Sequence, residues 1–139
     1  MKCNYTGLDF LENFVNISSK KYKKDKKAKF LKLNIKSQTI QKKYDWVLLS
    51  GTFNDKHKDS KKDMLKILIK MFKSCRKGIV FNSLSKYVDY EDEKLFYTYP
   101  DKIFSFCVKK LSKYVILITD YQLKKGVIPF EYTMCVKKK

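Results

Sequence analysis

The sequence has no long apolar stretch. No segment approaches the run of about 18 apolar residues that a membrane-spanning helix needs, and residues 1–10 do not resemble a signal peptide. We therefore expect no association with a membrane and a soluble, cytoplasmic protein. The 139 residues are 44% hydrophobic and 15% aromatic, which argues against disorder and is sufficient for one domain with a core.

Histidine and paired cysteines are also scarce. The only histidine is His57, and the four cysteines (Cys3, Cys75, Cys107 and Cys135) lie far apart, with no C-x-x-C pair. A zinc site needs closer ligand pairs or more histidine, so we expect no metal site. Free thiols in a reducing compartment are the favoured interpretation. A catalytic pair of Cys75 and His57 is a weaker alternative, because nothing near the thiol would activate it.

Arginine is almost absent although the chain is strongly basic. Lysine and arginine total 32 and the net charge is +18, yet the single arginine is Arg76. A basic chain can bind nucleic acid. Proteins that bind phosphate groups or contact base edges, however, usually also use the planar guanidinium group of arginine. A solvated, lysine-rich helix end is the favoured interpretation of the densest cluster, which lies in residues 20–27. Binding of RNA or DNA there stays open.

The apolar periodicity predicts alternating strands and helices, and hence an α/β domain with a mainly parallel sheet. Four consecutive apolar residues, 46–49, indicate a strand covered on both faces. Gly78 is expected to end the second helix as a C-terminal glycine, and a turn is expected at 124–129. Strands are predicted at 4–10, 30–35, 44–50, 79–82, 114–119 and 130–136, and helices at 11–24, 63–75 and 100–111.

Polar residues follow three of the predicted strands. Ligands of open α/β sheets bind beyond the carboxyl ends of the strands, and there the sequence has Asp9, Ser50 with Gly51, and Asn82. A carboxylate such as that of Asp9 can accept hydrogen bonds from both hydroxyls of a ribose. An equally supported alternative is that Asp9 caps the following helix.

The succession of these segments resembles the class I S-adenosylmethionine-dependent methyltransferases. Residues 5–9, 30–35 and 44–51 look like strands two, three and four of that family. Residues 78–84 look like strand five, and 120–121 followed by 130–136 look like the turn into the antiparallel strand seven. The resemblance covers nearly the whole chain. It implies a Rossmann-like methyltransferase fold, mainly parallel with an antiparallel last strand, and a partial methyltransferase domain over residues 1–139.

The resemblance also implies roles for single residues. The cofactor would be S-adenosylmethionine, and its methyl group would pass in line to an acceptor that the sequence does not identify. No catalytic base is assigned. Where the family often has an acidic residue beside the adenine, this chain has Asn34, whose amide oxygen can still accept a hydrogen bond. The implied cofactor residues are Asp9, Asn34, Ile35, Ser50 and Gly51, and the substrate-side candidates are Phe53, Asn54 and Asn82.

The chain departs from the family at its start. The family's first strand and glycine-rich cofactor loop have no counterpart, and no Gly-x-Gly occurs among the four glycines. That strand lies between strands two and four in the family, so its absence implies a gap in the sheet and impaired cofactor binding. We expect a truncated or split protein, with a complementing N-terminal fragment as partner. The alternatives are a degenerate methyltransferase-like subunit that binds a partner and a lysine-rich nucleic-acid-binding module.

Overall fold

The computed structural model describes residues 3–121 and 130–139 and divides the chain into two compact units, Met1–Thr39 and Ile40–Lys139. Each unit is described by itself. The predicted single domain over residues 1–139 stays a prediction, and the turn expected at 124–129 lies outside the described residues. Among the residues described, no helix is long and apolar enough to cross a membrane.

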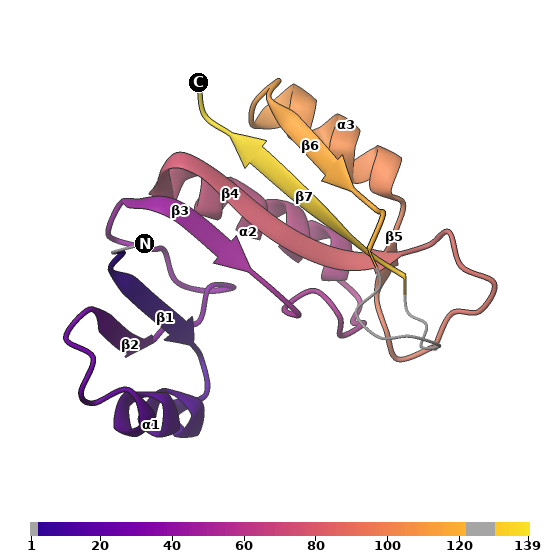
Figure 1. Cartoon of the computed structure of the whole chain (residues 1–139). Coiled ribbons are helices and arrows are strands. Elements are labelled where there is room, and N and C mark those ends of the chain that lie inside the picture. The colour runs from indigo at the N-terminus through magenta and orange to yellow at the C-terminus, as the bar shows by residue number, and fades with distance from the viewer. Residues whose placement is uncertain (1–2, 122–129) are drawn as a thin grey trace. The chain divides into compact units, whose positions relative to one another are not determined.

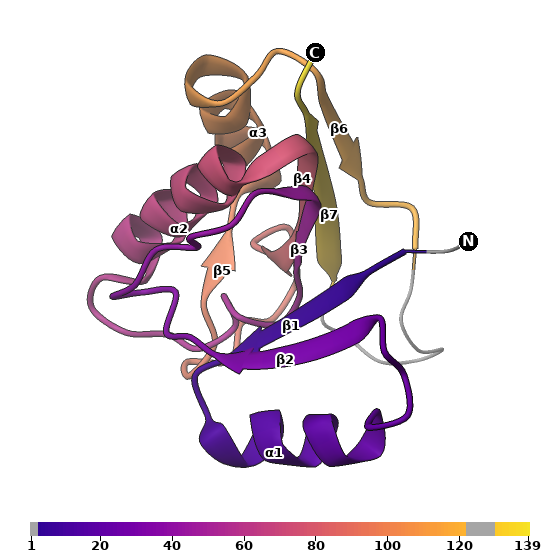
Figure 2. The same ribbon diagram turned by 90° about the vertical axis from the view of Figure 1, so that its left-hand side faces the viewer.

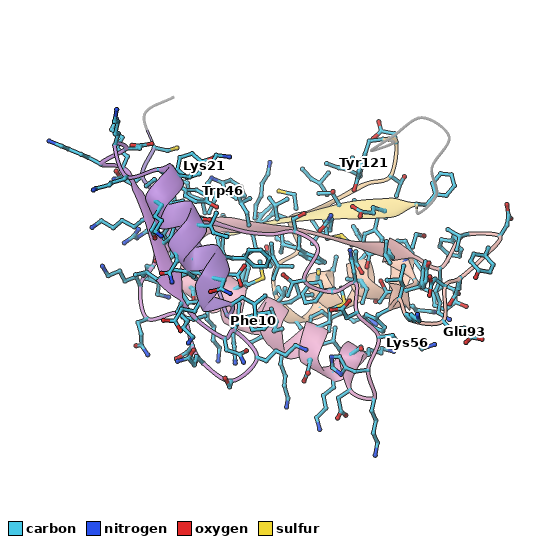
Figure 3. All side chains as sticks on the ribbon, turned by 90° about the horizontal axis from the view of Figure 1, so that it is seen from below. Phe10, Lys21, Trp46, Lys56, Glu93 and Tyr121 are labelled. Carbon is cyan, nitrogen blue, oxygen red and sulfur yellow. The ribbon has the colours of Figure 1, made fainter. Side chains whose placement is uncertain are left out.

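The first unit is a parallel pair of strands with one helix (Figure 1). In Figure 3, Lys21 is the last residue of the helix, and Phe10 lies two residues before its first. Gly7 lies at the centre of its strand with the Phe30 ring packed over it, since a Cβ there would lie 2.6 Å from that ring. The helix buries none of its own residues. The elements are β1 (Tyr5–Asp9), α1 (Glu12–Lys21) and β2 (Ala28–Lys32).

The second unit is a sheet in the order β3-β4-β7-β6, with the short β5 also paired to β4. Strand β4 is parallel to β3 and β5, whereas β7 is antiparallel to both of its neighbours, β4 and β6. The predicted parallel sheet with an antiparallel last strand is confirmed. The elements are β3 (Tyr44–Leu49), α2 (Ser60–Ser74), β4 (Cys75–Ser85), β5 (Tyr97–Thr98), α3 (Pro100–Lys110), β6 (Val115–Ile118) and β7 (Glu131–Lys137).

The core of the second unit lies between one face of this sheet and its two helices. Figure 2 shows α2 and α3 on the same side of the sheet. The apolar stripe predicted for α2 supplies fully buried side chains such as Met64 and Leu68, and alternate residues of β7 supply Tyr132 and Met134. The Tyr132 hydroxyl lies 2.6 Å from the Thr98 hydroxyl. Burial raises the pKa of Tyr132 to about 12, so its ring stays neutral at physiological pH.

The expectation for Gly78 is wrong. Helix α2 ends at Ser74, the next residue already belongs to β4, and Gly78 is an interior residue of that strand paired with Trp46. A Cβ at Gly78 would lie 2.6 Å from the Trp46 ring and 2.6 Å from the carbonyl oxygen of Val136. The glycine is therefore needed for close packing across the sheet and not for a helix cap.

The second unit by itself covers β3 on one face, so the expectation that both faces are covered stays a prediction. Val47 and Leu49 are half-buried on the helix side, but Leu48 is 69% exposed and Trp46 is 41% exposed. The sequence of β3 is thus that of a doubly covered strand, while α2 and α3 cover only one face of its sheet.

Candidate functional site

The first part of the candidate site is the carboxyl end of β1. Asp9 is the last residue of the strand and is half-buried. Its Oδ1 accepts a hydrogen bond from the backbone N–H of Leu11 at 2.8 Å, which turns the chain into α1. The residue at the helix N-cap is Leu11, without a side-chain cap, so the alternative that Asp9 caps the helix is wrong. A carboxylate has about four acceptor positions, and this local turn occupies one of them.

The second part follows β2. Because β2 ends at Lys32, Asn34 and Ile35 lie beyond the strand rather than within it. The Oδ1 of Asn34 accepts from the N–H of Lys36 at 3.0 Å, and the N–H of Asn34 donates to Gln38 at 2.7 Å. Asn34 is therefore exposed in a tight polar turn, and its amide oxygen keeps room for one further hydrogen bond.

The third part joins the turn after β3, the interior of β4 and the start of β7 in the second unit. Strand β4 continues to Ser85, so Asn82 does not end its strand as the sequence predicted. Gly51 follows β3 with a positive φ of 71°, and its N–H donates to the Oδ1 of Asn82 at 3.0 Å. The Nδ2 of Asn82 in turn donates to Glu131 at 2.6 Å. Asn82 thus holds the turn after β3 against the start of β7. Glu131 was not predicted as a site residue, although the alternation in 130–136 places it on the other face of the strand from the buried Tyr132.

The remaining candidates differ in what they contact. Phe53 is buried, and its ring packs edge-on against Phe81 with centroids 6.2 Å apart. The carbonyl oxygen of Asn54 accepts from the N–H of Phe96 at 2.7 Å. Ser50 is exposed at the end of β3. The substrate-side roles of Phe53 and Asn54 stay predictions, and in this structure both residues secure the loop after β3.

A hollow opens beside Glu131 at the ends of β4 and β6. Its lining includes Tyr87 and Asp101, whose hydroxyl and carboxylate are hydrogen-bonded at 2.9 Å. That hydrogen bond holds the pKa of the Asp101 carboxyl below its usual value. Phe130 and Thr119 also line the hollow, so it offers aromatic and acceptor groups together at the carboxyl end of the sheet.

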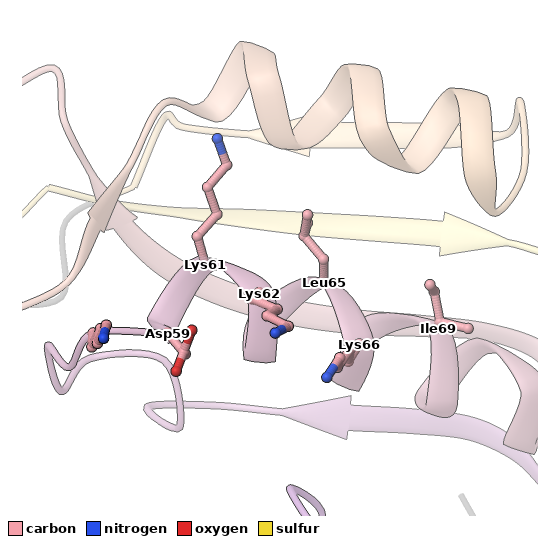
Figure 4. Close-up of a pocket in the computed structure, with 7 residues that line it drawn as sticks. Asp59, Lys61, Lys62, Leu65, Lys66 and Ile69 are labelled. Atoms are coloured by element: carbon pink, nitrogen blue, oxygen red, sulfur yellow. The ribbon is translucent and has the colours of Figure 1, made fainter.

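A second hollow lies on the outer side of α2. Figure 4 shows that its lining comes from α2 and the two residues before it, with lysines around two apolar side chains, Leu65 and Ile69. The ammonium groups are solvated, and this hollow contains none of the predicted site residues. We regard it as the solvent-exposed face of an amphipathic helix.

The bridge through Asn82 allows a first prediction. Asn82→Asp would place a second carboxylate beside Glu131, and we expect it to lower the free energy of unfolding by about 2 kcal/mol near neutral pH. Repulsion between the two carboxylates raises the pKa of this carboxyl pair in the folded state of the variant above its value in the unfolded state. The variant therefore keeps its stability at low pH and loses it as the pH rises through the folded-state pKa. Urea unfolding at about pH 4 and about pH 8 measures this.

The matched control for this prediction exchanges donor and acceptor. In the double variant N82D/E131Q the glutamine amide can donate to the new carboxylate, so we expect most of the lost stability at neutral pH to return. If Asn82→Asp unfolds like the wild type at both pH values, the bridge does not form in solution.

Known proteins resemble the chain in sequence and in fold. No family model matches it. It is 28% identical to the "Putative methyltransferase Rv1506c" of Mycobacterium tuberculosis over 149 residues, which take in 99% of this chain and 80% of that protein. The magnesium protoporphyrin IX methyltransferase of Synechocystis PCC 6803, crystallised with SAH, has a TM-score of 0.73 at 9% identity and covers 96% of this chain. An S-adenosylmethionine-dependent methyltransferase of Clostridium acetobutylicum has a TM-score of 0.68 at 13% identity, also over 96% of this chain.

These comparisons confirm the resemblance to class I methyltransferases and the Rossmann-like fold that it implies. They do not favour the two alternatives, a degenerate subunit and a nucleic-acid-binding module. The chain spans 64% of the Synechocystis chain and 74% of the Clostridium chain. Its relatives are therefore longer, and the activity of a whole methyltransferase does not follow from the match alone.

Proposed function

We propose that this chain, which is methyltransferase-like, serves S-adenosylmethionine-dependent methyl transfer to an acceptor. The observation that carries the proposal is the Rossmann-like methyltransferase fold, in which a half-buried carboxylate, Asp9, ends the first parallel strand. We keep residues 1–139 as one partial methyltransferase domain. The four unpaired cysteines support a reducing, cytoplasmic location.

The residues after β1 and β2 fit the nucleoside end of the proposed cofactor. Asp9 has spare acceptor positions for ribose hydroxyls, and Asn34 keeps an amide oxygen position that an adenine amino group can use. Ile35 offers an apolar side chain next to that turn. The bound cofactor supplies a methyl group that is already activated on a sulfonium, so the protein has to position the reactants and exclude water.

The end of β3 and β4 is the proposed reacting side. Gly51 has open space around its Cα, since a Cβ there would meet nothing within 4 Å. The N–H of Gly51 already donates to Asn82. The proposed role of Gly51 is therefore to let the cofactor approach the backbone closely and not to donate a hydrogen bond to it. Ser50 and the hollow beside Glu131 are the proposed positions for the cofactor's methyl-bearing part and for the acceptor. No residue here is assigned as a base.

Binding of S-adenosylhomocysteine, measured by calorimetry, tests the proposal. The glycine-rich loop that resemblance implies has no counterpart in residues 1–139, so we expect weak or absent binding to the chain alone. A chimera would carry, fused before Met1, the first strand and glycine-rich cofactor loop of a class I methyltransferase. We expect that chimera to bind at least about tenfold more tightly than the chain alone.

Each outcome has a definite meaning. Tight binding to the chimera and not to the chain supports the proposal and the need for the missing loop. Equal, tight binding to both would contradict the need for the loop. Absence of binding to a folded chimera would contradict the methyltransferase function and favour the degenerate, partner-binding alternative.

A further inference from the structure

The hollow beside Glu131 has the size of a small-molecule site. Its volume is about 310 Å³, which falls at the lower end of the range of about 300–1,000 Å³ that is typical of ligand pockets. All of its described lining residues belong to the second unit, so these residues set its chemistry within one unit. The hollow therefore suits a small molecule or one group of a larger one.

The charge of the hollow is opposite to that of the chain. Lysine and arginine make up 32 of the 139 residues, yet neither occurs among the described lining residues, which include two acids, Asp101 and Glu131. The long-range field of a chain with a net charge of +18 repels cations. The two carboxylates make the hollow a local exception, where a cation is favoured over an anion.

Both carboxylates can accept further hydrogen bonds. Asp101 accepts from the Tyr87 hydroxyl at 2.9 Å, and Glu131 accepts from the Asn82 amide at 2.6 Å. These donors are uncharged and do not compensate the negative charges, and a carboxylate has about four acceptor positions. Lys102 lies 3.8 Å from Asp101, but its side chain is 74% exposed, so water screens this ion pair. An ammonium group in the hollow can therefore form charge-assisted hydrogen bonds with both acids.

Aromatic rings lie next to these carboxylates. Tyr87 and Phe130 line the hollow and are 62% and 46% exposed. The Tyr87 ring contacts the Tyr99 ring with centroids 5.6 Å apart, and the Nζ of Lys86 lies 5.5 Å from the centroid of the Tyr99 ring. Aromatic faces attract cations within about 6 Å of the ring centroid. An ammonium group of this chain thus already lies over a ring beside the hollow, and the exposed rings of the lining offer a ligand the same contact.

A buried hydroxyl adds a neutral acceptor to the lining. Ser85 is 6% exposed, and its Oγ accepts from the N–H of Tyr87 at 3.1 Å. A hydroxyl oxygen has two lone pairs, and this hydrogen bond uses one of them. A primary ammonium group has three N–H donors, for which two carboxylates and one hydroxyl are suitable acceptors. The apolar Leu117 and Pro100 also line the hollow and suit the body of such a ligand.

We propose that this hollow binds the ammonium group of a small amine with an apolar body, and that the methyl acceptor is a molecule that carries such a group. The first half concerns binding alone, and the second rests on the proposed function. The ammonium group is the anchor, and another atom of the same molecule accepts the methyl group, because a nitrogen that stays protonated has no lone pair to offer. Asn82 connects Glu131 to the N–H of Gly51 and so links the anchor to the proposed reacting side.

Three probes with the same phenethyl body and different end groups test the binding. Phenethylamine is cationic at neutral pH, phenethyl alcohol is neutral and hydrocinnamate is anionic. Each is titrated into the full chain without cofactor, and binding is followed by the backbone amide chemical shifts of Ser85, Tyr87 and Glu131. We expect phenethylamine to bind there at least about tenfold more tightly than phenethyl alcohol, with hydrocinnamate the weakest of the three. The net charge of the chain opposes this order, so the order itself identifies the local carboxylates as its cause.

Two conservative variants remove one charge each from the hollow. Asp101→Asn keeps an oxygen that accepts from Tyr87, and Glu131→Gln keeps one that accepts from Asn82, so both variants retain the local hydrogen bonds. We expect each to weaken phenethylamine binding about fivefold and to leave the affinity for phenethyl alcohol unchanged. Glu93→Gln is the matched control, because Glu93 is exposed and lies outside the described lining. We expect this control to bind phenethylamine like the wild type.

The proposal is overturned if phenethylamine leaves the three amides unshifted, if phenethyl alcohol binds as tightly, or if Glu93→Gln weakens binding as much as the variants of the hollow. The titration of S-adenosylhomocysteine into the chimera is a separate test. A chimera that binds S-adenosylhomocysteine, together with a chain that does not bind phenethylamine, contradicts this inference alone. A chain that binds phenethylamine in the hollow, together with a folded chimera that does not bind S-adenosylhomocysteine, contradicts the proposed function and leaves an amine-binding site.

Discussion

Gly78→Ala is expected to destabilise the second unit by about 3 kcal/mol, a large part of the 5–15 kcal/mol typical of a domain. A methyl group at this position would lie 2.6 Å from the carbonyl oxygen of Val136 and 2.6 Å from the Trp46 ring. The ring can turn aside, but the carbonyl belongs to the neighbouring strand β7 and moves only if the sheet separates locally. Chemical unfolding followed by Trp46 fluorescence and by circular dichroism measures the loss.

Gly51→Ala is the matched control for this substitution. Gly51 has a positive φ of 71°, and a Cβ there would meet nothing within 4 Å. Its replacement should cost only the backbone strain of a non-glycine residue at positive φ, about 1 kcal/mol. If Gly51→Ala costs more than Gly78→Ala, or if Gly78→Ala is neutral, close packing between β3, β4 and β7 is not what requires the glycine.

Gly78 also shows which structural features local sequence can predict. The alternation of apolar patterns gave the order of strands and helices, because burial on one helix face or one sheet face leaves a period in the chain. The glycine after α2 has the same local signal as a helix cap. Its actual reason is close contact with the Val136 carbonyl oxygen and the Trp46 ring, 58 and 32 positions away in the sequence, which forms only after β3, β4 and β7 pair. No local pattern contains that contact.

The candidate site likewise contains residues that local sequence predicts and contacts that it does not. Asp9, which ends β1, and Gly51, which lies two residues after β3, follow from where the apolar runs stop. The bridge from Gly51 through Asn82 to Glu131 joins residues 31 and 49 positions apart, so only strand pairing reveals it. The local hydrogen bond of Asp9 also differs from the helix cap that the sequence equally supported, because the chain extends through Leu11 before α1 begins.

Asp9→Ala is expected to weaken binding of S-adenosylhomocysteine to the chimera roughly 100-fold. Two ribose hydroxyls donating to one carboxylate contribute about 1.5 kcal/mol or more each, since hydrogen bonds to charged groups exceed those between neutral ones. About 3 kcal/mol corresponds to a factor of roughly 100 in the dissociation constant. Asp9→Asn keeps one acceptor oxygen without the charge, so its affinity should lie between those of the unchanged chimera and of Asp9→Ala. Calorimetric titration of the three proteins measures the series.

Asp25 provides a control that isolates the cofactor role from the local fold. Its Oδ1 accepts from the N–H of Lys27 at 2.9 Å, which is the same two-residue turn that Asp9 makes with Leu11 at 2.8 Å. Asp25→Ala therefore removes an equivalent turn and an equivalent charge from the same unit. If both alanine variants weaken binding to the same extent, the effect of Asp9 comes from the turn or the net charge. If Asp9→Ala alone weakens binding while both melt at similar temperatures, the carboxylate of Asp9 binds the ribose.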